Sequence, residues 1–177
     1  MKKKIESLSA EEWQSLITPP SIKVAGLVIN FIDEQMHGMK MGMSGLNMVV
    51  DSWLTEWGFK DRIAELLDRG YEIIITSDHG NQEVLGIGNI NEGVKAETRG
   101  ERVRIYNDLS LRDSAAQACQ GSVITWPGPE LGLPKATYPL LANADCAFKS
   151  KGDVIVGHGG ISLHEVIVPF VIVNRKQ

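Results

Sequence analysis

Three of the four histidines in this chain stand in settings that suit metal ligands, and each setting follows a run of apolar, β-branched residues. The settings are Asp33-x-x-x-His37, Asp78-His79 and Gly157-His158-Gly159-Gly160. Such runs are typical of buried strands, and open α/β sheets bind their ligands beyond the carboxyl ends of the strands. The pattern therefore favours a fold in which several strands end close together around a metal site.

The order of apolar segments predicts a parallel sheet. Residues 23–31 and 71–76 are continuous apolar runs, as expected of buried strands. Residues 46–69 between them have a helical pattern, which Gly58 is expected to bend or break and Gly70 to end. Strand, helix and strand in this order form a βαβ unit with parallel strands. We therefore expect an α/β fold, a three-layer sandwich with a mostly parallel sheet.

The second half of the chain adds shorter elements. Residues 82–87 and 102–106 flank a polar, glycine-rich stretch and are expected to pair as a hairpin or to form an excursion. Residues 110–120 predict a helix and residues 123–126 a short strand. Residues 127–143 carry four prolines, which predicts a loop over the active face.

Both ends of the chain also have recognisable patterns. The last strands are expected at residues 154–156 and 166–173, where Pro169 favours an edge position or a bulge. Near the start, the Ser-Ala-Glu-Glu sequence at residues 9–12 fits a capping box that opens a helix. We therefore expect an N-terminal helix and turn in residues 1–20 and an α/β domain in residues 21–177.

Composition excludes some classes of protein. The 177 residues suit one domain with its own core, and the net charge of −4 gives no overall basic field for nucleic acid. No apolar run approaches the roughly 18 residues that span a membrane. Acidic residues follow the N-terminal lysines where a signal peptide would be apolar, so we expect a cytoplasmic protein. Cys119 and Cys146 lie far apart and are expected to be reduced thiols.

The three histidine motifs supply the candidate metal ligands Asp33, His37, Asp78, His79 and His158. Carboxylate and imidazole together suit Zn²⁺ or Mn²⁺. Each motif alone is also compatible with a structural role, as an N-cap, a capped loop or a loop histidine. Because all three follow strands expected in one sheet, together they favour a shared metal site.

A basic cluster supplies candidate substrate ligands. Arg99, Arg102 and Arg104 lie on the excursion between strands, and guanidinium groups hold phosphate through two hydrogen bonds. The alternative is a solvated hairpin face paired with Glu97 and Glu101.

The fourth histidine is expected to be structural. His164 lies in a short helical turn, with Ser162 as its N-cap and Glu165 near it.

Three stretches carry a family resemblance. They are IITSDHGN at residues 74–81, AETRGERVRIY at 96–106 and GHGGISLHEVIVPF at 157–170. With the Asp-x-x-x-His element, they resemble the PglZ domain of the alkaline phosphatase superfamily over residues 22–173. The likeness covers the C-terminal portion of a superfamily core.

The resemblance implies two divalent ions, Zn²⁺ or Mn²⁺, at the carboxyl ends of the strands. Asp33, His37 and His158 would bind one ion, and Asp78 and His79 the other. The family pattern also includes an aspartate on the first strand and a nucleophilic threonine or serine after it. We find neither here, and we expect a core that lacks its first strand.

The resemblance further implies a phosphodiesterase or phosphatase that acts on phosphate esters, nucleotides or oligonucleotides. Proteins with this domain are associated with bacterial phage resistance, including BREX systems, and with signalling, so other defence proteins are expected partners. The alternative function is a non-catalytic metal-binding or interaction module of a defence complex. An exposed sheet edge would then pair with another copy or another chain.

Overall fold

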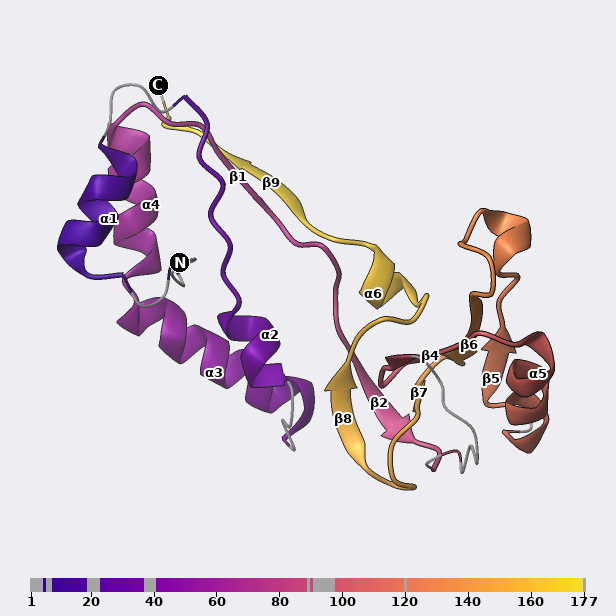
Figure 1. Ribbon diagram of the computed structural model, residues 1–177. Coiled ribbons are helices and arrows are strands. Elements are labelled where there is room, and N and C mark those ends of the chain that lie inside the picture. The colour runs from indigo at the N-terminus through magenta and orange to yellow at the C-terminus, as the bar shows by residue number, and fades with distance from the viewer. Residues whose placement is uncertain are drawn as a thin grey trace.

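The computed structural model describes residues 5, 8–18, 23–36, 41–88, 90, 98–119 and 121–176, which form two lobes (Figure 1). The helices are α1 (Ala10–Ile17), α2 (Phe31–Met36), α3 (Gly42–Glu56), α4 (Phe59–Asp68), α5 (Leu109–Ala118), α6 (Leu163–Val166) and the 3₁₀ turn η2 (Pro129–Leu131). The strands are β1 (Ile73–Thr76), β2 (Gln82–Gly86), β3 (Thr98–Arg99), β4 (Val103–Tyr106), β5 (Val123–Thr125), β6 (Tyr138–Ala142), β7 (Cys146–Ala147), β8 (Val154–Gly157) and β9 (Phe170–Val173). Among the described residues, no helix is both long and apolar enough to cross a membrane.

The first lobe is built around the packing of α1 against α4. The predicted capping box is confirmed: the Ser9 side chain accepts from the Glu12 amide, and the Glu12 carboxylate accepts from the Ser9 amide. Trp13 and Ile17 of α1 are buried with Leu66 of α4 in one apolar cluster. Helix α1 therefore packs as part of this lobe. The expected boundary between residues 1–20 and 21–177 stays a prediction.

The helical segment between residues 42 and 68 divides where the glycine pattern indicates. Gly58 lies between α3 and α4 with a φ of 67°, a left-handed conformation that suits glycine. The chain direction changes there, so one helix ends and the next begins. Gly70 has a φ of 86° and follows the end of α4. The predicted break at Gly58 and stop at Gly70 are both confirmed.

The strand expected at residues 23–31 is not formed. Residues 24–30 carry no regular secondary structure, and α2 begins at Phe31. A strand needs a neighbour for its backbone hydrogen bonds, which an apolar run by itself does not specify. The expected βαβ crossover is therefore also absent from the described chain. β1 pairs with β9 in an antiparallel two-stranded sheet instead.

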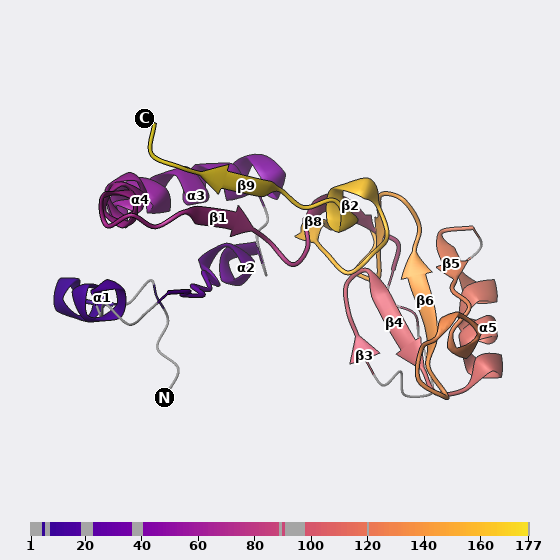
Figure 2. The ribbon, with the colours of Figure 1, turned by 90° about the horizontal axis from the view of Figure 1, so that it is seen from above.

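The second lobe contains two further sheets (Figure 2). One has the order β7-β2-β8, and the other has the order β3-β4-β6-β5. Helix α5 packs on the second sheet, with Ala115 in one cluster with Tyr106, Leu140 and Phe148. The prediction of a loop over residues 127–143 is wrong for its C-terminal part, because β6 occupies Tyr138–Ala142 in the middle of this sheet.

The strand pairings correct the predicted fold class. The mixed α/β content is confirmed, but the mostly parallel sheet is wrong. Among the described strands, only β2 and β7 pair in parallel, and the other pairs are antiparallel. The three-layer sandwich is not confirmed. The parallel prediction depended on a strand at residues 23–31, and that strand does not form.

Candidate metal centre

Three predicted ligands come together from distant parts of the chain. Asp33 of α2, His79 after β1 and His158 after β8 each offer a ligand atom, and these atoms lie within 4.8 Å of one another. His158 Nε2 lies 3.6 Å from Asp33 Oδ1. Two imidazoles and one carboxylate therefore converge at one point.

Apolar packing places α2 beside the end of β8. Met36 of α2, Leu46 of α3 and Val156 of β8 are buried together in one cluster. Met36 lies one helical turn from Asp33, and Val156 lies two residues before His158. This packing brings the Asp33 carboxylate to the histidine that follows β8.

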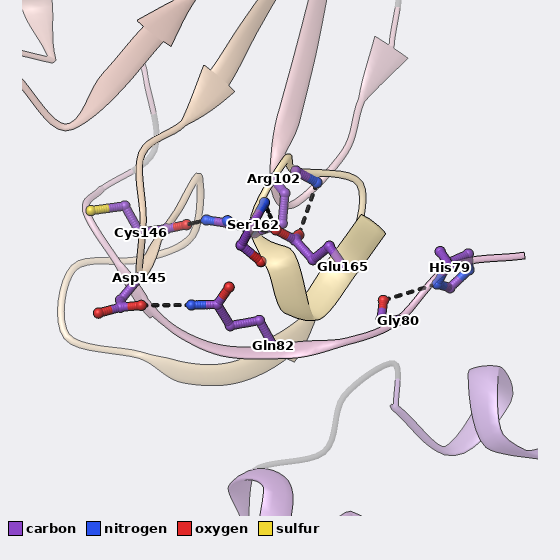
Figure 3. A network of polar contacts seen from close by, with 9 residues as sticks. His79, Gly80, Gln82, Arg102, Asp145, Cys146, Ser162 and Glu165 are labelled. Carbon is purple, nitrogen blue, oxygen red and sulfur yellow. Dashed lines mark hydrogen bonds and ion pairs between the residues drawn. The ribbon is translucent and has the colours of Figure 1, made fainter. Parts of the chain in front are cut away.

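The ring of His79 is oriented by a contact within its own loop. Its Nδ1 lies 3.1 Å from the carbonyl oxygen of Gly80 (Figure 3). A carbonyl only accepts hydrogen bonds, so this contact uses the tautomer of His79 with its proton on Nδ1, in which Nε2 is the atom able to bind a metal. The same arrangement orients histidine ligands in metal sites. The ring also stacks on His158, with centroids 3.9 Å apart and an interplanar angle of 7°.

The other two predicted ligands differ in position. The Asp78 side chain is 92% exposed, and its Oδ1 lies 3.7 Å from His79 Nε2. The same oxygen accepts a hydrogen bond from the His79 amide. His37 lies outside the described residues. The observed cluster thus takes members from both of the ligand sets that the resemblance implied, since it joins His79 to Asp33 and His158.

The donor set fits a divalent transition metal. Imidazole nitrogen and carboxylate oxygen are the ligands that Zn²⁺ prefers, with Mn²⁺ also compatible. The 3.6 Å between His158 Nε2 and Asp33 Oδ1 is close to the roughly 3.4 Å that separates two ligands of a tetrahedral zinc ion. The side chains of Asp33 and His158 are partly open to solvent, which leaves access for a further ligand.

Phosphate binding by Arg99, Arg102 and Arg104 stays a prediction. The structure describes side-chain contacts of Arg102 and Arg104. Arg102 is 1% exposed, and its Nε and Nη2 each lie 2.9 Å from an oxygen of Glu165. Arg104 is also buried, with its guanidinium over the ring of Phe148. Arg99 lies on β3 opposite Arg104.

Glu165, the carboxylate that binds Arg102, was not among the predicted site residues (Figure 3). Burial disfavours its charged form, but hydrogen bonds from Arg102, Ser162 and Gly160 outweigh this and lower the pKa of Glu165 to about 2. The detectable signal was the Ser-x-x-Glu spacing of residues 162–165, and the Glu165 carboxylate accepts a hydrogen bond from the Ser162 amide at 3.2 Å.

Comparison with known families identifies the same domain that the three quoted stretches resemble. A family model described as the BREX system PglZ alkaline phosphatase-like domain matches residues 1–173. No curated protein matches the chain. The family match covers nearly the whole sequence, and the chain therefore belongs to the PglZ alkaline phosphatase-like family of BREX systems.

Proposed function

We propose that this chain is a metal-dependent phosphohydrolase domain, a phosphodiesterase or phosphatase, that acts within a phage-defence system. The observation that carries the proposal is the convergence of Asp33, His79 and His158 within 4.8 Å. Membership of an alkaline phosphatase-like family supports phosphate esters as the substrate class, including nucleotides and oligonucleotides. BREX membership supports other defence proteins as partners.

The residues of the cluster have distinct parts in this proposal. A bound Zn²⁺ or Mn²⁺ would supply Lewis acidity toward a phosphoryl oxygen. His79 and His158 would hold the ion through imidazole nitrogens, and Asp33 would offset part of its charge. Asp78 lies beside His79 and is available as a further carboxylate ligand. In the family pattern His37 would join the Asp33 and His158 set. Among the arginines predicted from their chemistry, Arg99 would contact the phosphate.

Hydrolysis of two chromogenic esters tests the proposal. Bis(p-nitrophenyl) phosphate reports on phosphodiesterase activity, and p-nitrophenyl phosphate reports on phosphatase activity. Because the family's nucleophilic threonine or serine was not found here, water would serve as the nucleophile. The purified chain, reloaded with Zn²⁺ or Mn²⁺, is expected to hydrolyse one of the esters, and Asp33→Ala is expected to abolish turnover. Turnover that is equal in the parent and Asp33→Ala proteins contradicts the assignment of the site.

A second candidate function has its own observation. β1 and β9 pair only with each other among the described strands, and both present exposed apolar side chains, including Ile74, Phe170, Val171 and Ile172. Open strand edges with apolar faces pair readily with further strands. This favours an interaction module that pairs with a second copy through the edge of the β1–β9 sheet.

Light scattering separates the two candidates when it is combined with the ester assay. The interaction module predicts a dimer that Ile172→Lys converts to monomer, without hydrolysis by either species. A monomeric parent that hydrolyses either ester contradicts the module and supports the enzyme.

A further inference from the structure

We propose that Glu165 is a positioning residue that fixes the two loops of the metal centre, one carrying His79 and the other carrying His158. This inference rests on the proposed metal site at Asp33, His79 and His158. Glu165 contacts none of these three side chains in the described hydrogen bonds or ion pairs, so it would act through the backbone that carries the histidines. Its main-chain carbonyl binds the loop that carries His79, and its side chain binds the loop that carries His158.

The main-chain contact fixes the loop that carries His79. The carbonyl oxygen of Glu165 accepts a hydrogen bond of 2.8 Å from the amide of Gly80. Gly80 is the residue after His79, and its own carbonyl accepts from His79 Nδ1. The peptide unit that orients the His79 ring is thus adjacent to the amide that Glu165 binds.

The side-chain contact fixes the loop that carries His158. Glu165 Oε1 accepts a hydrogen bond of 2.8 Å from the amide of Gly160, two residues after His158. Glu165 Oε2 accepts from the amide of Ser162 at 3.2 Å. One carboxylate therefore binds two amides of the segment that leads from His158 into α6. Figure 3 shows Glu165 beside Ser162 in this segment.

Neighbouring atoms pack closely against Gly80 and Gly160. A β-carbon added at Gly80 would meet the carbonyl oxygen of His164 at 1.9 Å, and that oxygen is backbone. A β-carbon at Gly160 would meet Glu165 Oε2 at 2.6 Å and Arg102 Nη2 at 2.8 Å. Because the contacts are so close, a displacement of Glu165 would move both loops.

Arg102 anchors Glu165 to the second lobe. The two side chains form a two-point ion pair with both distances at 2.9 Å, and each side chain is 1% exposed. The Arg102 carbonyl accepts from the amide of Ala142 in β6, and its Nη1 donates to the carbonyl of Cys146 in β7. The contacts thus run from the sheets of the second lobe, through Arg102 and Glu165, to the loops that carry His79 and His158.

Cobalt binding tests the inference without any assay of activity. Co²⁺ replaces Zn²⁺ at such sites, and its visible absorption reports on ligand geometry. Glu165→Gln is expected to weaken Co²⁺ binding roughly 10- to 100-fold, the range found when residues that orient ligands are changed. The absorption spectrum should also change. Glu165→Asp, which keeps the charge opposite Arg102, should recover part of the affinity.

The side-chain variant should affect the two histidines unequally. Glu165→Gln keeps the main-chain bond to Gly80 and alters the bond to Gly160. In ¹⁵N-histidine NMR spectra, the His158 ring signals should therefore shift more than those of His79. A merely structural loss would not discriminate between the two rings.

Glu65→Gln is the matched control. Glu65 binds Trp13 Nε1 at 2.8 Å within the α1–α4 packing and takes no part in the metal cluster. Its substitution should lower stability and leave Co²⁺ affinity unchanged. Folded Glu165→Gln or Glu165→Asp protein with the parent's affinity and spectrum overturns the inference alone. A parent that binds no Co²⁺ overturns the proposed function as well.

Discussion

The imidazole rings of His79 and His158 stack with their centroids 3.9 Å apart. His79 follows β1, which pairs with β9, whereas His158 follows β8, which pairs with β2. The two strands thus belong to different sheets, and the loops beyond them bring the rings together. The proposed metal centre therefore depends on loop contacts as much as on the strands.

Replacement of His158 by alanine should weaken zinc binding by more than about 100-fold, since loss of a ligand exceeds the effect of disturbing its support. The free energy of unfolding of the metal-free protein should change by less than about 1 kcal/mol, because the side chain is partly exposed. Isothermal titration calorimetry and thermal unfolding measure the two quantities. His164→Ala is the matched control, because His164 is exposed and lies outside the cluster. Equal losses of zinc affinity in the two variants would refute the assignment.

Substitution of Gly80 by alanine should destabilise the fold by about 2–4 kcal/mol, as expected when a side chain is forced into a filled position. The added carbon would lie 1.9 Å from the carbonyl oxygen of His164, so the backbone must shift. Urea unfolding measures the loss. Gly26→Ala serves as the control, since its added carbon meets nothing within 4 Å. A Gly80→Ala protein as stable as Gly26→Ala would show that the two loops do not approach this closely.

Glu165 should make stability depend on pH in the acid range. Hydrogen bonds outweigh burial and lower its pKa from the usual 4.5 to about 2. A depressed folded-state pKa contributes stability that is complete above pH 4.5 and is lost as the pH falls toward 2. The contribution is on the order of 3 kcal/mol. Unfolding of the metal-free parent and Glu165→Gln proteins between pH 5 and pH 2 measures it. The parent should lose more stability than the variant over this range, and parallel curves would contradict the prediction.

The Glu65 carboxylate should stabilise the contact between α1 and α4. It accepts hydrogen bonds from Trp13, Gln14 and Arg69, which lower the pKa of Glu65. Glu65→Ala should cost about 1–3 kcal/mol, because it leaves the Nε1 donor of the buried Trp13 without its acceptor. Chemical denaturation measures the cost against Glu72→Ala, an exposed position. A cost no larger than that of Glu72→Ala would show that the carboxylate is dispensable.

Local signals in the sequence predicted individual elements well. The capping box at Ser9 and the left-handed glycine at Gly58 both act within one turn of the chain, and both are confirmed. The apolar run of β1 is likewise confirmed as a strand. Pairing between strands is a long-range property, so the antiparallel β1–β9 sheet could not be predicted from the run itself.

Two misassignments have specific physical causes. Residues 23–31 have the composition of a strand, but the run does not specify a hydrogen-bonded neighbour. β6 was not predicted because it contains Pro139, and a proline within an apolar run argues against a central strand. The sequence did predict Asp33, His79 and His158 as ligands, but only the fold shows that the three converge in one cluster. The role proposed for Glu165 depends on Arg102 and Gly80, two partners that lie far away in the sequence, so local spacing did not indicate it.

The most direct test of the metal centre is the metal content of Asp33→Asn protein. Parent and variant proteins would be reloaded with Zn²⁺ or Mn²⁺ and passed through gel filtration in chelator-free buffer. Metal per chain would then be measured by elemental mass spectrometry, with Glu34→Gln as the neighbouring control. We expect one ion per chain in the parent and in Glu34→Gln, and loss of that ion in Asp33→Asn. Equal metal in all three proteins, or none above background in the parent, would refute the metal site.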